Sequence, residues 1–352
     1  MSAFINWRNF EMKHTLVNKY QTLDDKNYYR ISMFNKNGVQ VDILNYGATL
    51  EHFFVPGRTS EKDNIILSLE RPEYYDKERN YLGGTVGRVI GRIAHGHWQD
   101  EDNTIQFELN DGPNHAHGGS KGFDTQVFGF TIKENENCSI LKLHLLDPDN
   151  YNNYPGNLSI YVTYTLTNEN TLIYEIEAIS DKKTLCNPAN HSYFNLNSGK
   201  DILDQYLTLD ADYYLPLDKN SIPTGEQKSV TNTPFDFRKP KLLGKAITSL
   251  DSQIREQLGL NHPFLLNRNN NIAAVLESLD HQRRLSVETT APSIVVYTGN
   301  HFNNSGFAQN IGQYGGVALE TQFPPSNDES LSSIVLLPYQ KFYSRTSWCI
   351  EF

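Results

Sequence analysis

The stretch that decides the fold runs from residue 159 to residue 179 and reads SIYVTYTLTNENTLIYEIEAI. Residues 159–166 and 172–179 are rich in β-branched and aromatic side chains at alternating positions, which is the pattern of half-buried strands. The polar residues 167–171 between them predict a turn. The stretch therefore predicts an antiparallel β-hairpin.

The same pattern of strands recurs along most of the chain, at residues 39–44, 104–109, 139–146, 206–213, 272–279, 284–290 and 293–298. Clusters of Gly, Pro, Asn and Asp separate these runs. A helix is predicted only for Ser249–Leu258, with Ser249 or Asp251 as its N-terminal cap. Because the strands do not alternate with helices, the sequence predicts an all-β, antiparallel sandwich or barrel rather than a doubly wound sheet.

The chain shows no linker, low-complexity tract or short repeat, so we expect residues 1–352 to form a single domain. Two stacked β halves within it stay compatible with the pattern. The longest turn-rich section, residues 215–241, contains four prolines and is expected to be a structured loop excursion.

The charge balance argues against nucleic acid or an anionic membrane as a partner, because 31 Lys and Arg face 41 Asp and Glu. The cysteines Cys138, Cys186 and Cys349 have no C-x-x-C spacing, which disfavours a disulfide framework or a thiolate zinc site and fits a reducing compartment. Residues 1–16 lack the apolar core of a signal peptide, and no apolar run approaches the roughly 20 residues that span a bilayer. We therefore expect a cytoplasmic protein.

One histidine stands among asparagines and aromatic residues in NPANHSYFNL, residues 187–196. His191 has the type of side chain that gains or loses a proton near neutrality. Asn187, Asn190 and Asn195 are costly to bury without partners, so together they indicate a polar pocket. A hydrogen-bonded core histidine is the alternative interpretation.

A carboxylate, Glu320, lies in a second strand-like run, GGVALETQ at residues 315–322. If Glu320 faces the interior, desolvation raises its pKa and makes it a better base. If strand alternation turns it to solvent, it is an ordinary surface charge. An acid and a base on separate strands are what a ring-opening proton transfer needs.

The glycine-rich run GGTVGRVIGR, residues 83–92, is a weak candidate for a phosphate cradle, because it lacks the Walker lysine and no helix pattern follows it. A bent strand with close backbone packing is the alternative. Arg88 and Arg92 have equal parity, so a regular strand would place both on one side, where one of them could donate to a ligand hydroxyl.

Two H-x-H pairs, His95 with His97 and His115 with His117, would each point to one face of a strand, as in some β-barrel metal sites. Neither pair has a third ligand at suitable spacing nearby, and we expect the first pair to lie in a surface turn. His117 follows the turn-forming residues 110–114, so it lies in a loop, where sites are common. No G-x-S-x-G occurs, so a serine nucleophile is not indicated.

Taken in order, these segments resemble the aldose 1-epimerases, also called galactose mutarotases, over most of the chain from Asn45 to Pro324. The segments that carry the resemblance are GRVIGRI (87–93), NHAHGG (114–119), NHSYFNL (190–196), DFR (236–238), VYTGN (296–300) and LETQ (319–322). The resemblance implies a large antiparallel β-sandwich with few short helices, a sugar cleft, no cofactor and no metal.

The resemblance also implies residue roles. His191 matches the general acid of the family and Glu320 its general base, while His117 and Arg92 match positions that contact the sugar. The implied activity interconverts the α and β anomers of free hexoses such as galactose and glucose, by acid-base opening and reclosure of the ring.

Three positions depart from the family pattern. Asn261 stands where the family usually has an aspartate that binds sugar hydroxyls, so we place Asn261 among the substrate-binding residues. Ala189 replaces a threonine, and Val295 replaces a glutamine that binds sugar in some members. These departures concern the preferred sugar more than the reaction.

Three other functions stay open on the sequence. A hexose-6-phosphate 1-epimerase of the same broad fold would need a cluster of Arg or Lys for the phosphate. A non-catalytic carbohydrate-binding β-sandwich would need the aromatic residues and asparagines but no acid-base pair. A metal-dependent β-barrel enzyme would use the H-x-H pairs. The expected partner is a small-molecule aldose, and we expect a monomer or a homodimer.

Overall fold

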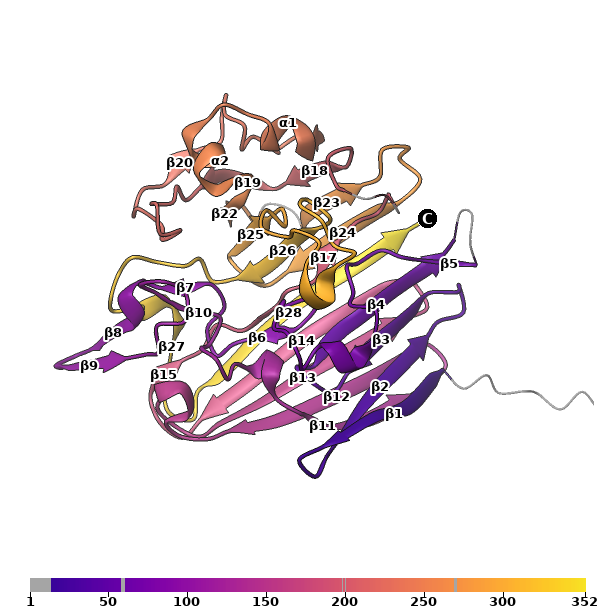
Figure 1. The fold of residues 1–352 in the computed structure, drawn as a ribbon, viewed down its shortest axis with the longest axis horizontal. Helices are drawn as coiled ribbons and strands as arrows, with labels where there is room; N and C mark the ends of the chain where they lie inside the picture. Colours follow the sequence, from indigo (N-terminus) through magenta and orange to yellow (C-terminus); the bar gives the residue numbers. More distant parts are fainter. Residues whose placement is uncertain (1–13, 58–60, 198, 200, 269–270) are drawn as a thin grey trace, which may run out of the picture.

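The computed structural model describes residues 14–57, 61–197, 199, 201–268 and 271–352, and most of its regular structure lies in three antiparallel sheets (Figure 1). The largest is a nine-stranded sheet ordered β11-β12-β13-β14-β28-β24-β23-β18-β21. Its strands are β11 (Gly129–Glu134), β12 (Cys138–Asp147), β13 (Leu158–Thr167), β14 (Thr171–Ser180), β28 (Lys341–Glu351), β24 (Arg284–Thr289), β23 (Ile272–Glu277), β18 (Tyr206–Leu209) and β21 (Lys241–Leu242).

The other two sheets have six and five strands. The six-stranded sheet contains, in spatial order, β17 (Tyr193–Phe194), β26 (Val317–Gln322), β25 (Ser293–Tyr297), β22 (Asn261–Leu266), β19 (Ala211–Tyr214) and β20 (Lys228–Ser229). The five-stranded sheet contains β1 (Thr15–Leu23), β2 (Lys26–Phe34), β3 (Gln40–Leu44), β4 (Thr49–Pro56) and β5 (Lys62–Asn64).

Short elements complete the fold. Four two-stranded pairs join β6 (Thr85–Val86) to β16 (Ala189–Asn190), β7 (Arg92–Ile93) to β10 (His115–Ala116), β8 (His97–Asp100) to β9 (Asn103–Gln106), and β15 (Thr184–Leu185) to β27 (Val335–Leu336). The α-helices of the described residues are α1 (Leu243–Ile247) and α2 (Ser252–Gln257). Single 3₁₀ turns are η1 (Pro72–Tyr74), η2 (Ala94–Gly96), η3 (Phe123–Thr125), η4 (Tyr151–Asn153), η5 (Gly306–Ala308) and η6 (Ser332–Ile334).

The hairpin predicted at residues 159–179 is confirmed. Strand β13 pairs antiparallel with β14, and Leu166 lies opposite Leu172 beside the turn. The alternation buries Val162 and Tyr164 completely, and the Tyr164 hydroxyl donates to the carbonyl of Ala48 at 2.8 Å. Because one apolar cluster takes buried side chains from all three sheets, the core lies between them, and the antiparallel sandwich is confirmed.

One predicted strand is in fact two. Residues 206–213 divide into β18 and β19, which belong to different sheets. The change occurs at Asp210, whose amide donates to Ala273 in β23 at 3.0 Å while its carbonyl accepts from Asn267 at 2.9 Å. The chain thus passes from one sheet to the other within one residue, which an unbroken alternating pattern conceals. The strand predicted at 104–109 also ends early, at Gln106.

The helix prediction is confirmed in α2, where the Asp251 carboxylate caps the first turn by accepting from the amide of Gln253 at 2.9 Å. The described residues contain a second short helix, α1 (Leu243–Ile247), which agrees with the expectation of few short helices but was not located in the sequence. Helix α1 has five residues and no side-chain cap, so it is too short to show a helical period in the sequence.

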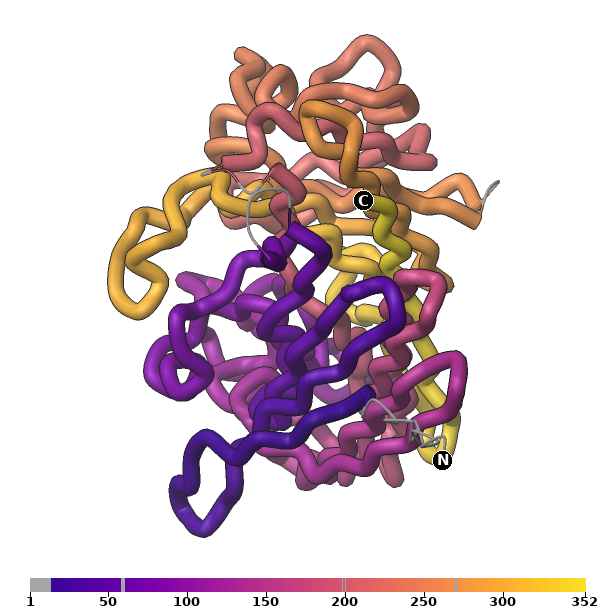
Figure 2. The backbone as a smooth tube through the Cα atoms, turned by 90° about the vertical axis from the view of Figure 1, so that its right-hand side faces the viewer, coloured from indigo at the N-terminus to yellow at the C-terminus, as the bar shows by residue number. Residues whose placement is uncertain are grey.

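The two views agree on how the chain is distributed. Strands β1–β4 and β11–β14 occupy one end, the orange segment with β19, β22 and α2 occupies the other, and the yellow strand β28 runs between them (Figures 1 and 2). None of the described helices is long and apolar enough to cross a membrane.

Candidate active site

A cleft of about 340 Å³ opens over one face of the six-stranded sheet. Side chains two positions apart on a strand point to the same face, and β22, β25 and β26 each contribute such a pair. The pairs are Asn261 with Pro263, Val295 with Tyr297, and Glu320 with Gln322. The glycine-rich segment and the 110–117 loop form the opposite wall. The structure brings all five predicted site residues to this cleft: Arg92, His117, His191, Asn261 and Glu320.

His191 and Glu320 meet at the floor of the cleft. The Nε2 atom of His191 lies 3.3 Å from Oε1 of Glu320, and the two side chains are 4% and 5% exposed. The backbone of His191 is held on both sides, because its amide donates to Gly84 and its carbonyl accepts from Gly83, each at 3.0 Å. Glu320 sits in β26 opposite Val295 of β25. Of the two orientations that the sequence left open, Glu320 therefore takes the one that faces the interior.

Burial raises the pKa of Glu320, because a buried carboxylate loses hydration. Three neighbours oppose this rise by favouring the ionised form: His191, Arg92 and the amide of Gln322. The Gln322 amide donates to Oε2 of Glu320 at 3.1 Å. The site thus holds a carboxylate that is more basic than an exposed one and still has partners for its charge.

His117 is a neutral imidazole in this cleft. Burial lowers its pKa well below the ordinary value, and the neighbouring His191 and Arg92 lower that pKa further. Its backbone is left-handed, with φ of 51°, which turns the side chain into the cleft. The amide of Gly91 donates to Nδ1 of His117 at 3.4 Å. Nδ1 is therefore the acceptor, and Nε2–H is free to donate to a ligand oxygen.

Tyr81 and Arg79 are cleft residues that the sequence did not reveal. The Tyr81 ring centre lies 4.5 Å from that of His117 and 6.0 Å from that of His191. The Arg79 guanidinium lies 4.6 Å from the Tyr81 ring centre, pairs with both oxygens of Asp124 at 2.6 Å, and donates to the carbonyl of His117 at 2.9 Å. Arg79 therefore fixes the loop that carries His117. The R-x-Y spacing just before the glycine run was the only sequence signal for it.

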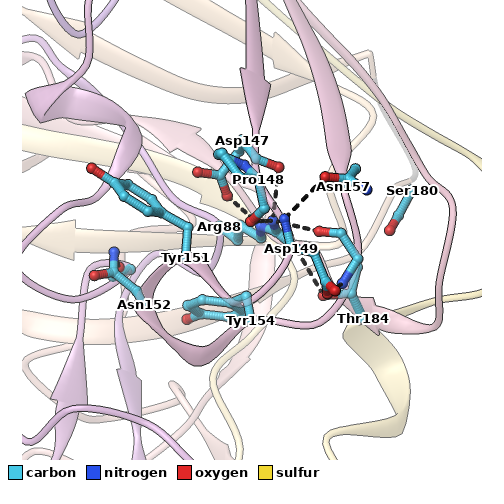
Figure 3. Close-up of polar contacts among 12 residues, drawn as sticks. Arg88, Asp147, Pro148, Asp149, Tyr151, Asn152, Tyr154, Asn157, Ser180 and Thr184 are labelled. Carbon is cyan, nitrogen blue, oxygen red and sulfur yellow. Dashed lines mark hydrogen bonds and ion pairs between the residues drawn. The ribbon is translucent and has the colours of Figure 1, made fainter.

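The expectation that Arg88 and Arg92 lie on the same side of a regular strand is wrong. Arg92 lines the cleft and pairs with Asp111 at 2.6 Å. Arg88 is not among the residues that line the cleft and is 1% exposed. Its ion-pair partner is Asp147 (Figure 3). Strand alternation does not hold here, because the glycine-rich segment is not a regular strand. Val89 makes an isolated parallel bridge to Asn187, and Gly91 has a φ of 76°.

Arg88 instead binds a buried cluster of hydrogen-bond acceptors. Its guanidinium donates to the carbonyls of Pro155 at 2.8 Å and Gly156 at 2.9 Å, and to the Thr184 hydroxyl at 3.1 Å (Figure 3). Every one of these partners belongs to the scaffold. Arg88 therefore ties the glycine-rich segment to the end of β12.

Asn261 reaches the cleft from the start of β22. Its amide nitrogen donates to Oε1 of Gln257 at 3.0 Å, and the Ser221 hydroxyl donates to the same oxygen at 2.9 Å. Gln257 thus fixes the Asn261 amide with its nitrogen turned toward α2. The Oδ1 atom of Asn261 is left as the acceptor for a ligand hydroxyl.

The asparagines around His191 serve the scaffold rather than the cleft. Asn190 donates to the carbonyl of Gly83 at 2.8 Å, Asn195 to that of Gly315 at 2.8 Å, and Asn187 to that of Phe323 at 3.1 Å. Their backbone bonding holds the segment on which His191 sits. The interpretation that these asparagines line a polar pocket is therefore wrong. All three are buried, but they bind backbone carbonyls.

The H-x-H pairs do not come together as metal ligands. His95 is exposed in the turn η2, as predicted, but His97 begins strand β8 and is partly buried. Both ring nitrogens of His115 are engaged, with the carbonyl of Glu108 and the hydroxyl of Tyr154 each at 2.8 Å, and burial lowers its pKa to about 4. His117 faces the cleft instead. Within the described residues, the set of three potential ligands whose atoms lie within 4.8 Å of one another is Asp42, Glu51 and His52, in β3 and β4, where Arg30 already pairs with Glu51.

Comparisons with known proteins agree on one family. The sequence pattern of the family described as aldose 1-epimerase matches residues 29–348. The aldose 1-epimerase of Haemophilus influenzae is 34% identical to this chain, over 86% of this chain and 88% of that one. The galactose mutarotase of Bos taurus is 33% identical, over 88% and 90%. The solved structure of a galactose 1-epimerase from Lactobacillus acidophilus covers 96% of this chain and 98% of its own, with a TM-score of 0.91 at 47% identity.

Proposed function

Because the chain belongs to the aldose 1-epimerase family, we propose that it interconverts the α and β anomers of a free aldose, with His191 as general acid and Glu320 as general base. The observation that carries the proposal is the buried pair itself. One potential acid and one potential base lie side by side, 3.3 Å apart, on the floor of a cleft.

The spacing of the pair fits the chemistry of an anomeric centre. Ring opening removes a proton from the hydroxyl on C1 and adds one to the ring oxygen. Both oxygens are bonded to C1, so they are neighbours, and the groups that serve them must be neighbours too. General acid-base catalysis needs each group within hydrogen-bond reach of its oxygen. An adjacent imidazole and carboxylate meet that condition.

The proton transfers balance over the cycle. Ionised Glu320 takes the proton of the C1 hydroxyl while the imidazolium form of His191 gives a proton to the ring oxygen. The bond from C1 to the ring oxygen breaks, and C1 becomes the carbonyl carbon of an open-chain aldehyde. After rotation about the C1–C2 bond, both protons return as the ring closes on the other face. Each group contributes roughly 10²–10⁴-fold to such a rate.

The other cleft residues are proposed to hold the sugar in place while the ring is open. Neutral His117 donates from Nε2, Arg92 donates from its guanidinium, and Asn261 accepts at Oδ1. Fixed hydroxyls keep the aldehyde in a geometry that recloses, which is the benefit of positioning in a unimolecular step. The Tyr81 ring adds an aromatic surface against which an apolar sugar face can pack.

The charges at the cleft favour a neutral sugar over a sugar phosphate. The arginines that line the cleft, Arg79 and Arg92, each have a carboxylate partner, Asp124 and Asp111. A phosphate would have to compete with those carboxylates for the guanidinium groups. Two relatives carry galactose in their names, and we propose galactose and glucose as substrates of this chain.

The proposal is tested by mutarotation of freshly dissolved α-galactose and α-glucose, followed by polarimetry, for wild type and Glu320→Gln. We expect the variant to lose at least 100-fold in kcat while a saturating sugar still binds by calorimetry. Glu177→Gln is the matched control, because Glu177 lies on β14 far from the cleft and pairs with Lys341. Near-normal rates in Glu320→Gln would refute the base assignment. A faster rate on glucose 6-phosphate than on glucose would point to the phosphosugar epimerase instead.

A further inference from the structure

Gln322 stands two residues after the proposed base on the same strand and shares its face of the sheet. Its side chain is almost completely buried, at 2% exposed, and it lines the cleft. Its amide nitrogen lies 3.1 Å from Oε2 of Glu320, on the oxygen that does not face His191. Each oxygen of the Glu320 carboxylate therefore has its own neighbour.

The chemistry of the two groups decides which way the Gln322 amide points. An ionised carboxylate only accepts hydrogen bonds, so the amide must turn its NH₂ toward Glu320. The carbonyl atom Oε1 must then point elsewhere. It is buried, and no described residue donates a hydrogen bond to it. A buried acceptor without a donor is costly, so Oε1 requires a partner that enters the cleft.

Gly91 is the neighbour of Oε1 at the wall of the cleft. A β-carbon built on Gly91 would lie 3.7 Å from Oε1 of Gln322. Both residues line the cleft. Oε1 itself is covered, so a donor reaches it by displacing the neighbouring groups slightly. A sugar hydroxyl is a small donor that suits this position.

We infer that Gln322 is a positioning and substrate-binding residue, which holds the Glu320 carboxylate ionised and oriented through its NH₂ and accepts a hydroxyl of the same sugar at Oε1. The inference rests on the proposed function. When the hydroxyl engages Oε1, the amide can no longer turn over, so its NH₂ stays directed at the base. Binding of the sugar thereby fixes the carboxylate that takes its C1 hydroxyl proton.

Two variants separate the two roles. Gln322→Met fills a similar volume but removes the donor and the acceptor together. Gln322→Glu keeps acceptor oxygens for the sugar and replaces the donor with a second carboxylate beside Glu320. Like charges raise a carboxyl pKa. Thr321→Val is the matched control, since Thr321 is the intervening residue, points to the opposite face, and loses only its 2.6 Å contact with the Thr346 hydroxyl.

The measurements are the pH dependence of kcat/KM for galactose mutarotation and a ¹³C NMR titration of the Glu320 carboxyl, with thermal unfolding to show that each variant is folded. For Gln322→Met we expect the acid limb of the kcat/KM profile and the midpoint of the Glu320 titration to move up by about one pH unit. We expect KM for galactose to rise about three- to tenfold. For Gln322→Glu we expect a larger upward move with KM close to wild type. Thr321→Val should match wild type in both readouts.

The outcomes distinguish this inference from the proposed function. If wild type does not mutarotate aldoses, the proposed function fails, and the inference fails with it. If wild type is active but the Glu320 titration is the same in Gln322→Met and wild type, Gln322 does not position the base. If KM rises equally in both Gln322 variants, the sugar does not donate to Oε1. Either result overturns the inference while the proposed function stands.

Discussion

At the scale of single residues, one neutral amide replaces a charge at the edge of the cleft. The nitrogen of Asn261 is held by Gln257, and Oδ1 is the acceptor that we propose for a sugar hydroxyl. A carboxylate at this position would make a charge-assisted bond to that hydroxyl, which is roughly twice as strong as a neutral one. Under the proposed function, Asn261 therefore binds the hydroxyl more weakly than an aspartate would.

We expect Asn261→Asp to be active and to bind sugar more tightly. The Gln257 amide must turn over to present its NH₂ to the new carboxylate, which is possible because its Oε1 partners are only Ser221 and Asn261 among the hydrogen bonds described. The gain of about 1 kcal/mol corresponds to a roughly fivefold lower KM with kcat little changed. The check is KM for galactose, glucose and their deoxy analogues. An unchanged KM across that panel would show that residue 261 does not touch the sugar.

Side-chain direction limited what the sequence could reveal about the site. His191 and Glu320 were found because each is a titratable residue within a distinctive segment. Gln322 and Tyr81 were not, because an amide and a phenol are common in strands and only the fold shows which of them face the cleft. Arg88 was assigned a cleft-facing side by strand parity, which does not hold where a segment bends at Gly91.

At the scale of elements, the glycine-rich segment is fastened to β12 by a buried ion pair. Arg88 and Asp147 are 1% and 4% exposed, and burial raises the pKa of Asp147 although the guanidinium opposes the rise. Removing one partner of a buried pair strands the other charge in the interior. This pair therefore supports the wall of the cleft without touching it.

We expect Arg88→Met to lower the free energy of unfolding by roughly 3–5 kcal/mol. The double variant Arg88→Met with Asp147→Leu should recover part of that loss, because it leaves no unpaired buried charge. Urea unfolding of both variants is the measurement. Arg238→Met is the control, since Arg238 is 37% exposed and its pairs with Asp212 and Asp236 are worth at most about 1 kcal/mol. Equal losses in the single and double variants would contradict this account.

The elements themselves were predictable where the pattern was long. The ten-residue strands β12, β13 and β14 alternate along their length, so the existence of all three and the hairpin of β13 with β14 follow from the sequence. The two-residue strands around the cleft, β6, β7, β16 and β17, were not predictable, because two residues carry no period. Their pairing depends on contacts between segments far apart in the sequence, as between Tyr193 and Ala318.

At the scale of the whole molecule, the buried carboxylate of Glu320 lowers the stability of the folded protein at neutral pH. The folded protein binds a proton at Glu320 more tightly than the unfolded chain does, because burial raises that pKa. A raised carboxyl pKa adds stability in acid, and the contribution is lost as pH rises through the folded-state pKa. At neutral pH the protein carries the cost of a buried carboxylate that the proposed mechanism needs.

Glu320→Gln should therefore be more stable than wild type at neutral pH, with a difference that shrinks as the buffer is acidified. Glu177→Gln is the control of opposite sign, because Lys341 lowers the pKa of Glu177 and its loss should slightly destabilise the neutral protein. The comparison is made by thermal and urea unfolding of each variant and of wild type, in neutral and in acidic buffer. A Glu320→Gln variant that unfolds more easily than wild type at neutral pH would show that the carboxylate is a net stabiliser.

The position of β28 has a consequence for biosynthesis. It follows the other described strands in the sequence, yet it lies between β14 and β24, so it links the two halves of the nine-stranded sheet. During translation, every residue that lines the cleft, from Arg79 to Pro325, emerges from the ribosome before residues 341–351 do. Until then β14 and β24 each present an open edge, which is a template for wrong pairing. Completion of the sheet therefore waits for eleven residues that contribute nothing to the cleft.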